Sequence, residues 1–308
     1  MTTSPVSRAS LTSRGHALDL SAAAFGELVR SDAFLGREDV LRERLARDGY
    51  LYLPGFFERD DVLTVRASLT QRLADQGLLN PAFPAIEAVW NPERRTAFQP
   101  DLAQRNPVLE DLVYGEALLG FYEGLLGESV RHFDYAWLRA VGPGMGTPPH
   151  CDLVYMGRGT RNLLTCWIPY GDVPLDLGGL IVLENSHRQA DRLRAYLDTD
   201  VDAYCENRPG DVRKVREGEG WSHPGWLSAN PATLREKLGG RWLTAEWKAG
   251  DLITFRMDLV HGSLDNATDR IRLSSDTRYQ RAGEPADERW VGPNPPGHSR
   301  AGKRGRVC

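Results

Sequence analysis

The stretch NLLTCWIPYGDVPLDLGGLIVLENS, residues 162–186, predicts the fold class. It holds two short apolar runs, separated by the Gly-, Pro- and Asp-containing residues 171–179. Short apolar runs bounded by turn residues are typical of strands, whereas helices need longer periodic segments. Similar runs occur from Val130 onward, among them RHFDYAWLRAV, RWLTAEWK, DLITFRM and RIRLSSDTRYQ. Such a series of short strands predicts a β-sandwich or β-barrel.

The first third of the chain has apolar residues at helical spacing instead. Helices are expected over residues 21–35, 37–49, 58–77 and about 107–126, with one strand over 50–57. Gly49 and Gly77 mark the ends of two of these helices, because glycine accommodates the left-handed backbone at a helix C-terminus. We therefore expect a mainly β domain with N-terminal helices packed on one sheet.

Composition indicates a soluble globular protein. Hydrophobic residues make up 41% and charged residues 26% of the 308 residues, which is close to the average for folded domains. The formal net charge of -4 gives no basic surface for nucleic acid. No apolar run approaches the roughly 18 to 20 residues needed to span a bilayer, so no membrane contact is expected. The sequence does not determine the oligomeric state.

The domain organisation follows from shifts in composition. We expect one domain over residues 21–281, preceded by a disordered tail over 1–20. Residues 188–240 are polar and Trp-rich and are much longer than an ordinary connection, which predicts a lid-like insertion that covers a site. Residues 282–308 are dense in Gly, Pro and Arg and predict a flexible C-terminal tail.

The cysteines give no sign of a disulfide framework. The four residues are Cys151, Cys166, Cys205 and Cys308, and they show neither paired spacing nor a C-x-x-C motif. The spacing does not suggest a zinc knuckle either. A cytoplasmic location is therefore the default expectation.

In TPPHCDLVYMGRGT, residues 147–160, a histidine and an aspartate lie one residue apart. If this segment is a strand, His150 and Asp152 share one face of it. Two histidines and one carboxylate are the ligand set of non-haem iron sites, and His261 is the candidate for the third ligand. An H-x-D pair also occurs in solvated surface turns, and the spacing alone leaves that alternative open.

A second unusual pattern lies in residues 270–280, where Arg270, Arg272 and Ser274 alternate with apolar residues. A buried arginine costs free energy unless it binds an anion. A hairpin would bring Arg272 close to His261, where its planar fork suits one end of a dicarboxylate. In the alternative interpretation, both arginines form a solvated edge with the neighbouring aspartates.

Four segments together resemble the phytanoyl-CoA dioxygenase family of iron(II)- and 2-oxoglutarate-dependent oxygenases. They are DGYLYLPGFFERDDV, PHCD, LLTCWIPYGDVPLDLGGLIVLENSHR and VHGSLDNATDRIRLSSDTRYQ, and the resemblance covers about residues 48–279. It implies a double-stranded β-helix core, also called a jelly-roll or cupin-like fold. It also implies Fe(II), 2-oxoglutarate and O2 as cofactor and co-substrates, and hydroxylation of a small molecule with release of succinate and CO2.

The resemblance implies roles for single residues. The iron ligands would be His150, Asp152 and His261. Arg272 would pair with the C5 carboxylate of 2-oxoglutarate, and the other residues at that co-substrate would be Thr165, Trp167 and Ser274. Glu184 and Asn185 replace the family's usual Pro-Gly in a loop. The carboxylate of Asp152 argues against halogenation, because halogenating relatives carry a small residue there.

The substrate is the least determined part of the sequence-based prediction. Candidate substrate contacts are Tyr135, Arg139, Tyr155, Trp221 and His223, each of which could equally serve packing. The polar and aromatic residues of 188–240 fit a natural-product or amino-acid-like metabolite. Desaturation or cyclisation would use the same site residues as hydroxylation. Two other functions remain open, a cupin-like metal-dependent isomerase or hydrolase and a non-catalytic small-molecule-binding barrel, although Arg272 and Ser274 favour the oxygenase.

Overall fold

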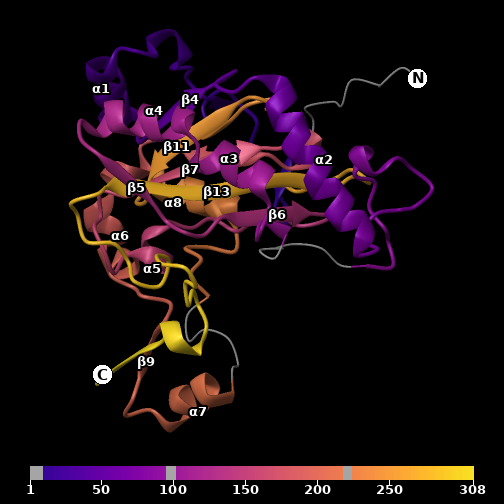
Figure 1. Ribbon diagram of the computed structural model, residues 1–308. Coiled ribbons are helices and arrows are strands. Elements are labelled where there is room, and N and C mark those ends of the chain that lie inside the picture. The colour runs from indigo at the N-terminus through magenta and orange to yellow at the C-terminus, as the bar shows by residue number, and fades with distance from the viewer. Residues whose placement is uncertain (1–9, 95–101, 218–223) are drawn as a thin grey trace.

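The computed structural model describes residues 10–94, 102–217 and 224–308 (Figure 1). Two sheets form its centre, so the prediction of a mainly β protein is confirmed. The larger sheet has the order β4-β11-β7-β13-β5, and β6 also pairs with β13; the smaller has the order β12-β8-β10-β3. Their strands are β3 (Phe25–Glu27), β4 (Tyr50–Leu53), β5 (Val130–His132), β6 (Trp137–Val141), β7 (Leu164–Pro169), β8 (Leu180–Leu183), β10 (Trp242–Thr244), β11 (Leu252–Arg256), β12 (His261–Ser263) and β13 (Arg272–Arg281).

The two sheets pack against each other through apolar side chains. Trp167 and Phe255 of the larger sheet share one buried core with Val182 and Leu243 of the smaller sheet. Strand β13 is buried along nearly its whole length and pairs antiparallel with β7. Because successive side chains of a strand point to opposite faces, one face of β13 can serve the helix-side core while the other faces the space between the sheets.

Four helices cover the outer face of the larger sheet, as the sequence predicts (Figure 1). They are α1 (Glu38–Asp48), α2 (Arg59–Asp75), α3 (Pro107–Tyr114) and α4 (Glu116–Leu126). Their apolar residues, such as Val65 of α2 and Leu118 of α4, share a core with Leu273 and Tyr279 of β13. The single helix expected over 107–126 is instead two helices, because the backbone at Gly115 is extended (φ -75°, ψ 171°).

The helix expected over residues 21–35 is wrong. This segment forms β3, which pairs in parallel with β10 at the edge of the smaller sheet, followed by a 3₁₀ turn at Asp32–Phe34. Pairing with a sheet edge satisfies the backbone and overrides the local helical spacing of apolar residues. The remaining helices are α5 (Leu153–Met156), α6 (Ala190–Leu197), α7 (Pro209–Glu217) and α8 (Pro231–Leu238). None of the described helices combines the length and apolarity that a membrane crossing requires.

The structure differs from the expectation for both tails. Residues 1–9 lie outside the described residues, but β1 (Thr12–Ser13) and β2 (His16–Ala17) pair, and Leu11 is buried. At the other end, Trp290 is buried with its ring centroid 4.6 Å from that of Trp137. Strand β14 (Arg304–Arg306) also pairs with β9 (Ala203–Cys205). The expected flexible C-terminal tail is thus packed onto the domain.

A disulfide joins Cys205 to Cys308, which corrects the prediction that the cysteines do not pair. The parallel pairing of β9 and β14 places Arg306 opposite Cys205, so Cys308 follows close by. The two cysteines are 103 residues apart, and nothing in their spacing reveals the contact. Cys151 and Cys166 are buried free thiols.

Candidate active site

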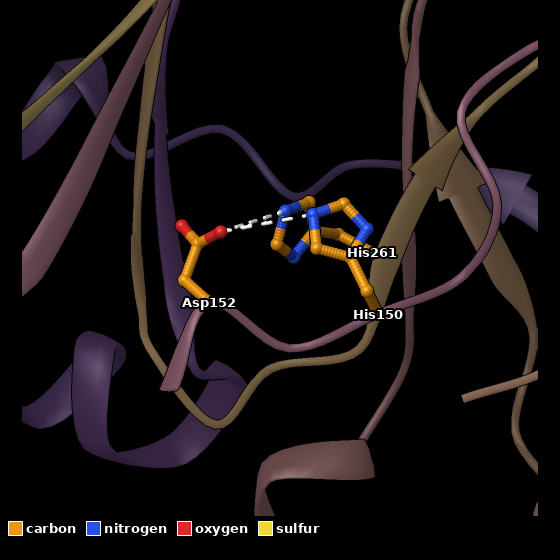
Figure 2. A group of neighbouring side chains, drawn as sticks. All are labelled: His150, Asp152 and His261. Atoms are coloured by element: carbon orange, nitrogen blue, oxygen red, sulfur yellow. Dashed lines mark ion pairs between the residues drawn. The ribbon is translucent and has the colours of Figure 1, made fainter. Parts of the chain in front are cut away.

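The three predicted ligands converge between the sheets (Figure 2). His150 and His261 face each other across an antiparallel bridge, in which each backbone N–H donates to the other's carbonyl at 2.9 Å. Both Nε2 atoms lie 3.7 Å from Oδ1 of Asp152. All three side chains are buried. One nitrogen from each ring and one carboxylate oxygen therefore point to a common centre.

The secondary structure that positions these residues at the centre differs from the prediction. Asp152 does not continue a strand but has helical dihedral angles (φ -64°, ψ -24°) and directly precedes α5. The expected hairpin between His261 and Arg272 is also wrong, because β12 and β13 belong to different sheets. Arg272 therefore approaches the centre from the sheet opposite His261.

Backbone carbonyls fix the tautomer of each histidine. Nδ1 of His150 lies 2.9 Å from the carbonyl of Pro148, and Nδ1 of His261 lies 3.0 Å from that of Leu259. Because a carbonyl can only accept, Nδ1 must carry the proton in each ring, and Nε2 of the neutral ring offers a lone pair. Burial, with the adjacent His261, lowers the pKa of His150 to about 3, and burial also lowers the pKa of His261. Both rings are thus neutral near pH 7, as metal ligation requires.

Two donors hold the other oxygen of Asp152. The hydroxyl of Thr165 donates to Oδ2 at 2.5 Å, and Nη2 of Arg278 donates to the same atom at 2.9 Å. Burial alone would raise the pKa of Asp152, but Arg278 and the two histidines hold this pKa well below its usual range. The carboxylate is therefore ionised, with Oδ2 engaged and Oδ1 facing the histidines.

Arg278 is a site residue that the sequence analysis missed. The alternation that singled out Arg272 and Ser274 continues through Asp276 to Arg278 on the same face of β13. Following the same alternation four residues beyond Ser274 would have identified Arg278. The hydroxyl of Thr165, which the resemblance assigned to the co-substrate, lies in hydrogen-bonding contact with the Asp152 carboxylate.

A narrow inner cavity adjoins the two histidines, and Trp167, Leu180 and Arg272 are among its lining residues. Arg272 is only 2% exposed and donates to Oγ of Ser274 at 2.5 Å. No carboxylate in the described part of the chain forms an ion pair with it, and its Nε has no hydrogen-bond partner. Burial and the nearby charge of Arg139 lower the pKa of Arg272 to about 10. Asp276 also lines this cavity, but its Oδ2 pairs with Arg139 at 2.7 Å. A buried cation without an ion-pair partner of its own is costly, so this cavity is suited to an anion.

The solvated-edge alternative applies to only one of the two arginines. Arg270 is exposed and pairs with Glu87 at 3.1 Å, whereas Arg272 is buried. Arg270 therefore forms an ion pair at the surface, whereas Arg272, two residues later, is a buried cation.

A larger outer cavity of about 430 Å³ also adjoins the centre and is lined by His150 and Asp152. Its lining is mainly apolar, with Trp137, Pro148, Tyr155, Met156, Pro224 and Trp226, together with His298. It shares Arg139, Thr147 and His150 with the inner cavity. The volume lies within the range of small-molecule sites, roughly 300–1,000 Å³. The two cavities therefore meet at the candidate metal centre.

The predicted substrate contacts have different positions. Arg139 and Tyr155 line the outer cavity, and Arg139 also pairs with Asp276 at 2.7 Å. Tyr135 borders a separate cavity of about 390 Å³ and packs against Trp137. The other two candidates, Trp221 and His223, lie outside the described residues.

His298 is a further cavity residue that the sequence did not reveal. It lies in the Gly- and Pro-rich C-terminal segment, which has no periodicity that places a side chain in a site.

Comparison with known proteins identifies relatives of this chain. The 1-deoxypentalenic acid 11-beta-hydroxylase of Streptomyces exfoliatus is 26% identical over 252 residues, which cover 76% of this chain and 78% of that protein. The enzyme of the same name from Streptomyces arenae is 24% identical over 276 residues, covering 84% and 86%.

Solved structures share the fold. EctD from S. alaskensis, with 2-oxoglutarate and 5-hydroxyectoine, has a TM-score of 0.57 at 20% identity and covers 96% of this chain and 93% of its own. The epimerase SnoN, in complex with Fe3+, alpha ketoglutarate and nogalamycin RO, has a TM-score of 0.55 at 18% identity, covering 84% and 87%.

The family model for phytanoyl-CoA dioxygenase (PhyH) matches residues 45–274, which include all three converging side chains and Arg272. This match spans well over half of the sequence. The chain belongs to the phytanoyl-CoA dioxygenase family.

Proposed function

We propose that this protein is an Fe(II)- and 2-oxoglutarate-dependent dioxygenase with a double-stranded β-helix core, which hydroxylates a small molecule and releases succinate and CO2. One observation carries the proposal. A centre of two neutral imidazoles and one carboxylate lies beside a buried arginine that has no carboxylate partner among the described residues. A metal-dependent isomerase or hydrolase would need the centre but not the internal cation.

The ligand set fits ferrous iron. His150 and His261 would each supply Nε2, and Asp152 would supply Oδ1, which leaves coordination positions open for other molecules. A bound ferrous ion with 2-oxoglutarate and O2 supplies the oxidation of a substrate C–H bond. The protein's part is to hold these three atoms in place and keep both imidazoles unprotonated. Arg278 and Thr165 support this geometry by fixing Oδ2 of Asp152.

Arg272 would anchor the distal carboxylate of 2-oxoglutarate. Its guanidinium offers a planar pair of donors, and Ser274 holds one of its nitrogens in place. Trp167 lies beside it, with the guanidinium carbon 5.9 Å from the ring centroid. The inner cavity has room for only about 20 Å³ in this conformation, so entry of a five-carbon diacid requires side chains to move.

The outer cavity would bind the substrate. Its aromatic lining suits a molecule with a mainly apolar body, such as a natural product, better than a charged amino-acid-like metabolite. The named activity of the curated relatives, hydroxylation of 1-deoxypentalenic acid, supports a small-molecule substrate. Pro224 and Trp226 bring the 188–240 insertion to this cavity, which supports its role as a lid. The cytoplasmic location remains a prediction, and the Cys205–Cys308 disulfide would be reduced there.

An anaerobic metal titration tests the proposal. Adding Fe(II) and then 2-oxoglutarate to the protein should produce a weak visible charge-transfer band. His261→Ala should abolish the band. Arg270→Ala, which changes an exposed arginine just before β13, should leave the band intact. A wild-type protein that shows no band would support the zinc-type enzyme or the binding barrel instead.

A further inference from the structure

The side chains that line the inner and outer cavities carry an excess of positive charge. Three arginines and two aspartates are the charged residues of these linings: Arg139, Arg272, Arg278, Asp152 and Asp276. The ligand histidines His150 and His261 are neutral near pH 7, because burial lowers the pKa of each. The third lining histidine, His298, would add to the excess if it were protonated. The linings therefore contain more cationic than anionic groups.

Binding of the proposed metal and co-substrate leaves this excess in place, because the charges of Fe(II) and of the 2-oxoglutarate dianion cancel. Arg272, in the inner cavity, would face the distal carboxylate of the diacid. Asp152 would be shared between the metal ion and Arg278, which lines the outer cavity. The excess positive charge therefore lies toward the outer cavity. A net charge that is buried from water costs free energy, so a substrate with one negative charge is favoured there over a neutral one.

Arg139 is the lining arginine that a ligand can reach most easily. Its side chain is 23% exposed, whereas Arg272 and Arg278 are buried. Nε and Nη2 of Arg139 each lie 2.7 Å from Oδ2 of Asp276. Because the guanidinium is a planar fork, this contact uses one edge of it and leaves Nη1 on another edge. Nη1 has no hydrogen-bond partner among the described residues.

The position of Arg139 gives the outer cavity a charged end and an apolar end. Arg139 lines both cavities, so it lies where they meet at the candidate metal centre. Trp137, two residues earlier on the same face of β6, lines the outer cavity alone. Trp137, Met156 and Trp226 together offer an apolar surface. A molecule with an anionic group at Arg139 would therefore place an apolar body against these side chains.

We propose that the substrate is a carboxylate with an apolar body, and that Arg139 is the specificity-determining residue that binds its two oxygens. The inference rests on the proposed function, which assigns the substrate to the outer cavity. Nη1 and the second N–H of Nη2 form an edge of the guanidinium that matches the planar carboxylate. Asp276 holds the other edge, so the fork is already in position before a ligand binds.

Binding of matched probes to the anaerobic Fe(II)–2-oxoglutarate complex tests this proposal. The probes are open-chain and ring-containing molecules of about ten to fifteen carbons, a size that suits the cavity. Each apolar body is used as the carboxylate, the primary amide and the ammonium compound, and affinities are measured by titration calorimetry. We expect the wild type to bind a carboxylate about tenfold more tightly than its amide, because hydrogen bonds to a charged group are stronger than neutral ones. The ammonium compound should bind most weakly.

Two variants separate direct binding by Arg139 from the general charge of the site. Arg139→Gln combined with Asp276→Asn removes the fork and its partner together, so the net charge of the linings is unchanged and no carboxylate is left unpaired. The preference for the carboxylate over the amide should then fall to about threefold or less. Arg139→Lys keeps the charge but lacks the planar fork, so it should retain only part of the preference.

Arg281→Gln is the matched control. Arg281 is also an arginine of the larger sheet that pairs with a carboxylate, Glu128 at 3.0 Å, but it lies outside both linings. This variant should keep the preference of the wild type.

The outcomes are distinguishable. The proposal is overturned if no carboxylate binds the wild type more tightly than its amide, or if the double variant keeps the full preference. It is also overturned if the Arg139 variants change only the 2-oxoglutarate requirement, since Arg139 would then serve the co-substrate. The charge-transfer band shows that each variant still binds Fe(II) and 2-oxoglutarate. If the double variant lacks the band, Arg139→Lys provides the comparison, and an unchanged preference there overturns the proposal.

Failure of this proposal differs from failure of the proposed function. Absence of the charge-transfer band in the wild type would refute the proposed function itself. A normal band without a preference for the carboxylate would refute only the substrate class and the role of Arg139.

Discussion

The inner and outer cavities meet at one metal centre but are built in different ways. Arg272, which lines only the inner cavity, forms no ion pair with a carboxylate in the described chain. Arg278, which lines only the outer cavity, pairs with Asp152, and Arg139, which lines both, pairs with Asp276. The inner cavity is formed by sheet residues within the family match, but the outer one also takes residues from the insertion and the tail. The sheets thus carry the chemistry that relatives share, and peripheral segments can vary the substrate.

Removing a ligand that both cavities share should have the largest effect. His150 lines both cavities, and His150→Ala should reduce succinate formation to background because one of three ligand atoms is lost. Asp152→Ala should do the same and should also lower the free energy of unfolding by roughly 3–5 kcal/mol, because it leaves Arg278 buried without its carboxylate.

Mass spectrometry of succinate and urea unfolding measure the two effects separately. The difference in stability between the two variants is the sharper test, since both lose activity. Normal turnover in either variant would contradict the ligand assignment. Equal stability of the two variants would contradict the account of the Arg278–Asp152 pair.

Much of the inner cavity could be predicted from sequence, because strand periodicity and residue type carry the information. His150, Asp152, His261 and Arg272 do lie together in the structure. The backbone that brings them together could not be predicted from local pattern. The helical turn at Asp152 and the separation of β12 and β13 into two sheets depend on pairing with distant strands.

Arg272→Ala should raise the KM for 2-oxoglutarate by roughly 100-fold, because one partner of a buried charge pair is removed. The iron requirement should change little, since Arg272 is not one of the three converging ligands. Arg270→Ala is a matched control from the same end of the same segment, and its exposed ion pair with Glu87 should be worth at most about 1 kcal/mol to stability.

Steady-state kinetics at varied 2-oxoglutarate and varied Fe(II) give both requirements. An unchanged 2-oxoglutarate requirement in Arg272→Ala would show that the inner cavity does not bind the diacid at this residue. The assignment of the co-substrate to the inner cavity and of the substrate to the outer cavity would then lose its main support.

Thr165→Val distinguishes two roles for one hydroxyl. The structure places this hydroxyl on Oδ2 of Asp152, so its loss should weaken Fe(II) binding by roughly tenfold, the lower end of the effect of removing a hydrogen bond to a metal ligand. If Thr165 instead contacts 2-oxoglutarate, as the family resemblance implies, the KM for the diacid should rise while iron affinity stays constant. Valine has nearly the same shape as threonine, which keeps the strand packing comparable.

The outer cavity could hardly be predicted from sequence. The insertion is recognisable by its length, but Gly- and Pro-rich composition gave the wrong expectation for residues 282–308. That segment is ordered by long-range contacts, in which Trp290 packs on Trp137 and Arg289 binds Asp202. Such contacts join residues about 90 to 150 positions apart, and local composition carries no signal for them.

Cys308→Ser should have the smallest effect on catalysis. It tests whether the disulfide is needed to hold the C-terminal segment against the outer cavity. The ion pair between the buried Asp202 and Arg289 remains when the disulfide is lost, and so does the pairing of β9 with β14. We therefore expect the 2-oxoglutarate and Fe(II) requirements to be unchanged and the affinity of the outer cavity for apolar small molecules to fall by no more than about threefold, since a buried network fixes its members without the covalent link. The free energy of unfolding should fall by about 2–4 kcal/mol, because the bond closes a loop of about a hundred residues in the unfolded chain. Unfolding of the oxidised wild type, the reduced wild type and the variant measures this loss. The reduced wild type and the variant should have the same free energy of unfolding. A loss of small-molecule binding at the outer cavity in Cys308→Ser, with unaltered 2-oxoglutarate kinetics, would show that the disulfide, rather than the buried charges, holds the C-terminal segment in place.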